Sequence, residues 1–152
     1  MYEVPEPRYG EVMEEWTLPI DTGEIPESGT RFEVNVVGGG PAGAAAASYN
    51  ALNGCKVLLI EKEVWPRDKV CGDAVGGKSL SHVEELGVKE MVEATPHFRV
   101  DSIVFGSANG TEVRVMLPED TYVKLQSGYA LPRVQFDYIK FKRSNTLVTE
   151  GG

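Results

Sequence analysis

Residues 32–61 read FEVNVVGGGPAGAAAASYNALNGCKVLLIE, and they contain the strongest indication of the chain's fold class. Residues 32–37 are rich in β-branched side chains and stop at three successive glycines, which is typical of a buried parallel strand that runs into a tight turn. The small residues from Ala42 to about Asn53 predict a helix that lies against a sheet, with Gly54 at its end. Lys56 to Ile60 predicts a second strand. Together the three elements predict a βαβ unit.

The turn carries the spacing G-x-G-x-x-G at Gly38, Gly40 and Gly43. In a dinucleotide-binding unit the first glycine permits the turn, the second lets the backbone approach a pyrophosphate, and the third lets the helix pack closely on the strand. Pro41 suits a first helical turn, whose free N–H groups and positive dipole end favour a phosphate. Glu61 follows Gly43 by 18 positions, where a carboxylate can accept both hydroxyls of an adenosine ribose and would repel a 2′-phosphate. The pattern predicts a dinucleotide site, and the alternative is a plain glycine-rich turn in an unrelated α/β domain.

Length and composition indicate one globular domain, since the chain has 152 residues and 41% of them are hydrophobic. The formal charge of −8 is unevenly distributed. Residues 1–31 hold eight of the 23 acids and two of the 15 bases. This acidic, proline-rich extension predicts an irregular segment, either a solvated tail or an arm that binds a partner.

Several classes of function are disfavoured. The chain has no basic patch that would suit nucleic acid, and no apolar run approaches the ~18 residues that span a bilayer. Without a secretory leader pattern the protein is expected to be cytoplasmic, with peripheral membrane contact left open. His82 and His97 have no metal-ligand spacing, so no metal is expected. Cys55 and Cys71 flank a strand about 20 Å long, so a disulfide between them is not expected.

The loop after Glu61, KEVWPRDKVCGDAVGGKSL, is dense in charge and glycine. Ligands of open α/β sheets bind outside the carboxyl ends of the strands, which is where this loop begins. It is either a surface loop with solvated charges or a cofactor loop. In the second interpretation Arg67 or Lys69 faces a pyrophosphate, and Cys71 with Gly72 packs on the reactive ring, because glycine permits close approach and a thiol is small and polarisable.

The next two segments predict short helices. Residues 80–87 place apolar side chains at helical spacing, with Ser81 and Glu84 as a capping box and Gly87 at the end. Residues 88–94 predict another short helix.

The hydrophobic period then changes to that of strands. Residues 103–117 alternate around the Asn109-Gly110 turn signal, which predicts an antiparallel hairpin, and residues 122–125 can add a third strand. Residues 129–137, YALPRVQFD, predict a strand end that leads into a helix starting near Arg133. An arginine at a helix start is either solvated or in contact with the cofactor.

Taken in order, VVGGGPAG, LLIEK, the Lys-Val-Cys-Gly loop and YALPRVQFD resemble the N-terminal part of the geranylgeranyl reductase family of FAD-dependent oxidoreductases. This family lies within the larger group of aromatic-hydroxylase-type flavoproteins. The resemblance covers residues 32–143 and implies a partial, truncated FAD-binding domain of Rossmann type, an α/β fold with an antiparallel hairpin inserted near residues 98–126. It leaves residues 1–31 unmatched, and residues 144–152 depart from the family pattern in mid-helix.

The resemblance implies FAD as the cofactor, with Cys71 the nearest candidate for a catalytic residue. The residues expected to bind FAD are Gly38, Gly40, Pro41, Ala42, Gly43, Glu61, Lys62, Arg67, Cys71, Gly72, Ala74 and Arg133.

In this family a flavin reduced by an external donor, NAD(P)H or ferredoxin, delivers hydride to isoprenoid double bonds of prenylated lipids or of the chlorophyll side chain. The resemblance therefore implies a prenylated lipid substrate and an oxidoreductase function. Three alternatives remain. An NAD-dependent Rossmann dehydrogenase would continue with regular βα units, and an FAD-dependent monooxygenase or halogenase would share this half of the fold. The third alternative is an inactive, truncated FAD-binding fragment, because the second Gly-Asp flavin motif of the family is not in the sequence.

Overall fold

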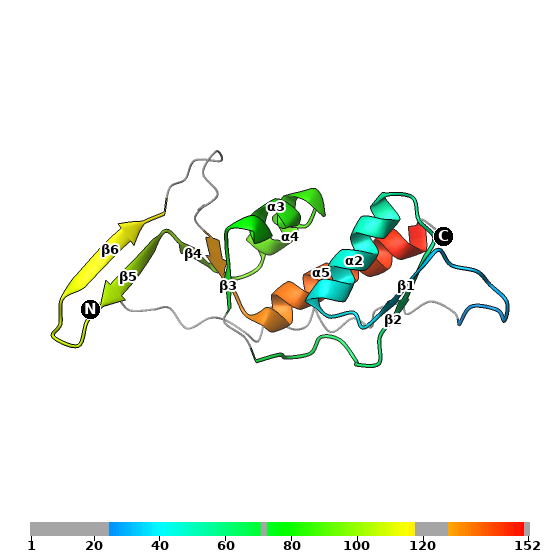
Figure 1. The fold of residues 1–152 in the computed structure, drawn as a ribbon, viewed down its shortest axis with the longest axis horizontal. Coiled ribbons are helices and arrows are strands. Elements are labelled where there is room, and N and C mark those ends of the chain that lie inside the picture. Colours follow the sequence, from blue (N-terminus) through cyan, green and yellow to red (C-terminus); the bar gives the residue numbers. More distant parts are fainter. Residues whose placement is uncertain (1–24, 71–72, 118–127, 151–152) are drawn as a thin grey trace. The chain divides into compact units, whose positions relative to one another are not determined.

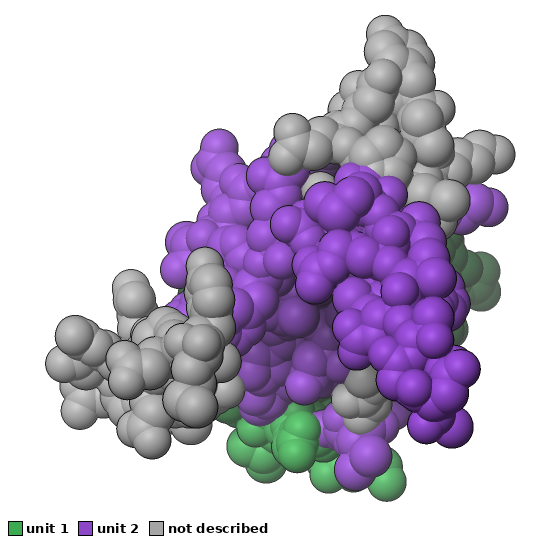
Figure 2. Space-filling model, turned by 90° about the vertical axis from the view of Figure 1, so that its left-hand side faces the viewer, with its two compact units in different colours: residues 1–68, 137–152 green, residues 69–136 purple. Residues whose placement is uncertain are grey.

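A computed structural model describes residues 25–70, 73–117 and 128–150, and its fold is α/β (Figure 1). The chain divides into two compact units (Figure 2). The first unit comprises residues 1–68 and 137–152, and the second comprises residues 69–136. Within the described ranges, no helix is both long enough and apolar enough to cross a bilayer.

The first unit is built on a parallel pair of strands. Strand β1 (Val34–Val37) pairs with β2 (Val57–Ile60) in a register that sets Val34 opposite Val57 and Val37 opposite Ile60. Helix α2 (Pro41–Leu52) connects the two strands and packs on both of them (Figure 1). The predicted βαβ unit is confirmed.

Helix α2 begins and ends where the sequence predicts. Gly40 is the N-cap, with an extended backbone, and Pro41 occupies the first turn, where its missing N–H costs no hydrogen bond. Gly54 follows the helix with a φ of +82°, the left-handed conformation that suits glycine after a C-cap. The helix approaches the strands closely because its buried face is made of small side chains, namely Ala44, Ala47 and Ser48.

The prediction that the first strand is buried is wrong for the described residues. The side chains of β1 alternate between half-buried and exposed, Val37 is 80% exposed, and its partner Ile60 is 48% exposed. The physical reason is that the described sheet of this unit has two strands and α2 packs on only one of its faces. The opposite face, at the carboxyl ends of both strands, is open.

An aromatic cluster completes the first unit. Helix α5 (Arg133–Glu150) contributes Tyr138 and Phe141, which pack with Trp65 and the half-buried Leu59 of β2. Residues 144–150, which were expected to form a tail, continue this helix.

The second unit contains a three-stranded antiparallel sheet in the order β3–β7–β4. Its strands are β3 (Ala74–Val75), β7 (Gly128–Ala130) and β4 (Phe98–Val100). Gly128 lies where any Cβ would overlap the Val75 carbonyl oxygen, so the central strand passes its neighbour as closely as backbone allows. The strand end at residues 128–130 leads into α5 at Arg133, as predicted.

Helices α3 (Lys78–Glu85) and α4 (Lys89–Ala94) match the two predicted short helices, but the predicted capping box is wrong. Helix α3 has its N-cap at Gly77, four residues before Ser81, and the Gly77 φ of +56° turns the chain into the helix. Ser81 therefore lies inside the helix, where its hydroxyl donates a hydrogen bond of 2.8 Å to the Lys78 carbonyl.

The predicted hairpin is confirmed as β5 (Ser102–Gly106) and β6 (Glu112–Met116). Gly110 closes its turn with a φ of +86°. The register brings four apolar side chains to one face, and each of them is between 43% and 60% exposed: Ile103, Phe105, Val113 and Val115. The third strand predicted at residues 122–125 lies outside the described residues.

Candidate functional site

The glycine turn between β1 and α2 is the centre of the site. Gly38 takes a φ of +98° and donates its N–H to the Ile60 carbonyl at 2.7 Å, which ties the turn to the end of β2. A Cβ on Gly43 would overlap the Gly38 carbonyl oxygen and would lie 3.4 Å from Val36 Cγ1. This backbone therefore requires glycine at Gly38 and Gly43, whereas at Gly40 an added Cβ would only touch Arg67 Nη2 at 3.4 Å and take up space in front of the turn.

Glu61 lies beside the turn and fastens it. Its Oε2 accepts the Gly39 N–H at 2.7 Å, while its Oε1 accepts the backbone N–H groups of Lys62 at 2.7 Å and Glu63 at 2.8 Å. Partial burial acts to raise the pKa of Glu61, but these three hydrogen bonds and the Arg67 charge outweigh it and hold that pKa below its usual value. The group is a carboxylate at neutral pH, and Oε2 keeps one lone pair that no described residue takes up.

Arg67 brings a positive charge to the same turn. Its Nη2 would lie 3.4 Å from a Cβ on Gly40, and its guanidinium carbon lies 4.9 Å from the centre of the Trp65 ring. Its Nε is buried and has no hydrogen-bond partner among the described residues. Arg67 lies near enough to the Glu61 carboxylate to lower its pKa, and together with the positive end of α2 its cation favours a further anion at the turn.

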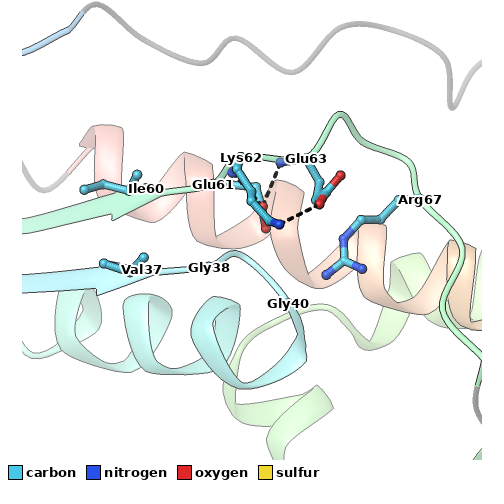
Figure 3. Close-up of a pocket in the computed structure, with 8 residues that line it drawn as sticks. All are labelled: Val37, Gly38, Gly40, Ile60, Glu61, Lys62, Glu63 and Arg67. Atoms are coloured by element: carbon cyan, nitrogen blue, oxygen red, sulfur yellow. Dashed lines mark hydrogen bonds and ion pairs between the residues drawn. The ribbon is translucent and has the colours of Figure 1, made fainter.

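These groups line a pocket of about 490 Å³ (Figure 3). In Figure 3 the Arg67 side chain extends toward the loop at Gly40, while Val37 and Ile60 lie side by side at the strand ends. The pocket thus joins an apolar strand edge to a charged rim and a bare backbone turn. Its lining residues are Val37, Gly38, Gly40, Ile60, Glu61, Lys62, Glu63 and Arg67.

The remaining predicted residues of the first unit lie close by in the chain. Ala42 and Gly43 are in the first turn of α2, and the Pro41 carbonyl accepts a hydrogen bond of 3.1 Å from Lys140 Nζ on α5. Lys62 lies on the pocket rim, with Nζ 3.3 Å from the Glu63 carboxylate.

Two predicted residues lie in the second unit. Ala74 pairs with Ala130 across β3 and β7, and the Arg133 backbone N–H donates to Asp73 Oδ1 at 3.2 Å. Cys71 and Gly72 lie outside the described residues. The structure therefore brings together the predicted residues of the glycine turn and of the segment from Glu61 to Arg67.

Sequence reasoning missed the aromatic support of the pocket. Trp65 and Phe141 stack with ring centres 4.7 Å apart and planes 14° apart, and both are buried. A Cβ on Gly39 would overlap the Phe141 ring, so the middle glycine of the turn lies directly against this stack. No local signal connects residues 76 positions apart, although a tryptophan two positions before a loop arginine does indicate that the two side chains could form a cation–π contact.

A parallel strand–turn–helix–strand unit, with a G-x-G-x-x-G turn and a carboxylate at the tip of the second strand, defines a dinucleotide-binding protein of Rossmann type. The sequence model described as "FAD binding domain" matches residues 31–135. The chain therefore belongs to this FAD-binding domain family, and FAD is the cofactor.

Individual relatives agree with this assignment. The chain is 32% identical to the menaquinone reductase of Mycolicibacterium smegmatis over 71% of its length and 37% identical to digeranylgeranylglycerophospholipid reductase 1 of Methanothermobacter thermautotrophicus, also over 71%. It spans about a quarter of the length of both reductases. Its structure is similar to that of the flavin-dependent brominase Bmp2, with a TM-score of 0.65 and 25% identity over 81% of this chain and 28% of the brominase.

Proposed function

We propose that the protein is an FAD-dependent oxidoreductase that reduces isoprenoid double bonds of a prenylated lipid. FAD binding is supported mainly by the glycine turn. There, backbone without side chains, the N-terminus of α2 and the Arg67 cation lie at the same pocket. The lipid part is supported by the similarity to the reductases of menaquinone and of digeranylgeranylglycerophospholipid.

The residues of the first unit fit the adenosine diphosphate portion of FAD. Gly40 leaves a cradle that a side chain would fill, and the Arg67 guanidinium, whose Nη2 lies nearest to Gly40, supplies a cation for a phosphate. Pro41, Ala42 and Gly43 form the helix start that faces the diphosphate, and Glu61 Oε2 accepts a ribose hydroxyl with its remaining lone pair. Lys62 forms the outer rim of this site.

A second set of residues is proposed for the flavin end. These residues are Cys71, Gly72, Ala74 and Arg133. When bound, reduced FAD supplies the hydride for reduction of a double bond, and the chain's own residues bind and orient the cofactor. Cys71 is the candidate for a residue that contacts the reacting ring. The electron donor is proposed to be NAD(P)H or ferredoxin, and the protein is proposed to be cytoplasmic with peripheral membrane contact.

The experiment is a two-step assay on the purified chain. FAD is first titrated, with binding followed by calorimetry and by the flavin absorption spectrum. The FAD-loaded protein is then reduced anaerobically with NAD(P)H or reduced ferredoxin and mixed with a geranylgeranylated lipid. The proposal predicts flavin reoxidation and a lipid mass gain of two hydrogens for each reduced bond. Tight binding of NAD without any uptake of flavin would contradict it.

A second candidate is an FAD-dependent monooxygenase or halogenase. The similarity to the brominase Bmp2 favours it, since that structure matches most of this chain. It predicts that reduced, FAD-loaded protein consumes oxygen and, without saturating double bonds, hydroxylates an added aromatic or prenyl acceptor, or halogenates it when bromide or chloride is supplied. Anaerobic lipid saturation would decide against this candidate.

A further inference from the structure

The Arg67 guanidinium is held over one aromatic ring at the glycine turn. Its central carbon lies 4.9 Å from the centre of the Trp65 ring, which is within the range of a cation–π contact. Its Nη2 is the nearest atom to the space above Gly40. Trp65 is 8% exposed, so the ring has little freedom to move away from beneath the guanidinium.

A second ring fixes the first. Phe141 of α5 stacks on Trp65 with nearly parallel planes, 14° apart, and is itself 6% exposed. The same Phe141 ring lies against Gly39, so one helix contacts both the tryptophan and the glycine turn. The contacts therefore run from Gly39 to Phe141, to Trp65, to Arg67 and back to the turn at Gly40.

We propose that Trp65 and Phe141 are positioning residues that hold the Arg67 guanidinium ready for the diphosphate of the dinucleotide. This inference rests on the proposed binding of FAD at the glycine turn. A guanidinium fixed in advance loses little side-chain freedom when it binds a phosphate, so the affinity for the diphosphate depends on the two rings. Neither ring contacts the ligand in this account, and both act through Arg67.

A simpler role for the two rings is to fill the core of the first unit. Core filling predicts that losing Trp65 lowers the melting temperature and weakens ligand binding to the same extent whether or not Arg67 is present. Positioning predicts that the effect on binding disappears once Arg67 is gone. A double-mutant cycle separates the two roles, because contacting residues that act through one another give non-additive effects.

The test uses the full chain with ADP and FAD as probes, titrated by calorimetry, and a thermal melt of each variant. Trp65→Leu is expected to weaken ADP binding about tenfold, and Trp65→Phe, which keeps a ring under the guanidinium, less than about threefold. Arg67→Gln is expected to weaken ADP binding at least about tenfold, and adding Trp65→Leu to it is expected to cost less than about twofold more. Phe105→Leu, an aromatic substitution on the exposed hairpin, is the matched control and should leave the affinity unchanged.

Phe141→Leu provides a second route to the same cycle if Trp65→Leu does not fold, and it is expected to show the same dependence on Arg67. Equal losses from Trp65→Leu with and without Arg67, or no rescue by Trp65→Phe, would overturn the positioning role while leaving FAD binding intact. A wild-type chain that binds neither ADP nor FAD would overturn the proposed function itself.

Discussion

At the turn between β1 and α2, the Gly38 carbonyl occupies the place that a Cβ on Gly43 would take, whereas at Gly106 in the β5–β6 hairpin an added Cβ meets nothing within 4 Å. The apolar residues differ in the same way. Trp65 and Phe141 near the turn are 8% and 6% exposed, while Phe105 and Val113 of the hairpin are 60% and 58% exposed. The glycine turn is therefore packed closely by other residues of its own unit. The hairpin has its strands paired in register, but one apolar face of it is exposed.

This contrast separates two kinds of structural requirement. At the turn, backbone segments and a few buried side chains lie in close contact, so a substitution that adds even one carbon atom there should lower the free energy of unfolding. The hairpin depends on strand pairing and turn chemistry, which tolerate changes on the open face. Four substitutions test the contrast.

The largest effect is expected for Gly43→Ala. The new Cβ would overlap the backbone oxygen of Gly38, which cannot move without breaking the turn, so the substitution should cost at least about 3 kcal/mol of unfolding free energy. Gly106→Ala is the matched control, and it should change stability by less than about 1 kcal/mol. Urea unfolding of both variants checks this, and equal costs at the two glycines would remove the contrast.

Gly39→Ala should cost less, about 1 to 3 kcal/mol, because the overlapping group is the Phe141 side chain and not the backbone of the turn, so the overlap can be relieved without breaking the turn. The cost should shrink in the presence of Phe141→Leu, since the smaller side chain makes room for the new methyl group. The measurement is the coupling free energy from a double-mutant cycle. Additive costs would show that Phe141 does not press on the turn.

Glu61→Gln should lower stability by about 1 to 2 kcal/mol near neutral pH, because either amide orientation sets an N–H group against a backbone N–H donor. The folded protein holds the pKa of Glu61 below its usual value, so the carboxylate stabilises the fold above its unfolded pKa. This contribution is lost as the pH falls through the lowered pKa. The difference between wild type and Glu61→Gln in urea melts should therefore shrink in acid, and a difference that grows as the pH falls would contradict the account.

The smallest effect is expected for Phe105→Thr on the open face of the hairpin. Its side chain is 60% exposed and threonine suits a strand, so stability should change by less than about 0.5 kcal/mol. Light scattering should show no more self-association than in the wild type, because the exposed apolar patch becomes smaller. A fall of several kcal/mol in the free energy of unfolding would mean that Phe105 is buried against another part of the protein, contrary to this prediction.

The parts of the fold that the sequence predicted are those set by local chemistry. Gly38 and Gly43 of the motif, Pro41 at the helix start and the Asn109-Gly110 turn each satisfy a backbone requirement within a few residues. The pocket at the glycine turn was also predicted from the sequence, because Glu61 and Arg67 follow the second strand closely in the chain and line the same pocket as the turn.

The parts that were missed depend on distant contacts. Strands β3 and β4 are two and three residues long and exist because β7 pairs with both, so no periodicity predicts them. The capping box at Ser81 failed because Gly77 starts the helix earlier. The stack of Trp65 on Phe141 joins a loop to a helix far along the chain, and only the folded structure brings them together.

The most direct test of the central claim is a calorimetric titration of wild type and Arg67→Gln with FAD, with ADP as a competitor. We expect saturable binding of one FAD per chain by the wild type, displacement of FAD by ADP, and an affinity for FAD at least about tenfold weaker in Arg67→Gln. Binding of FAD that ADP does not displace, and that is equally tight in Arg67→Gln, would contradict the assignment of the glycine turn and Arg67 as the diphosphate site.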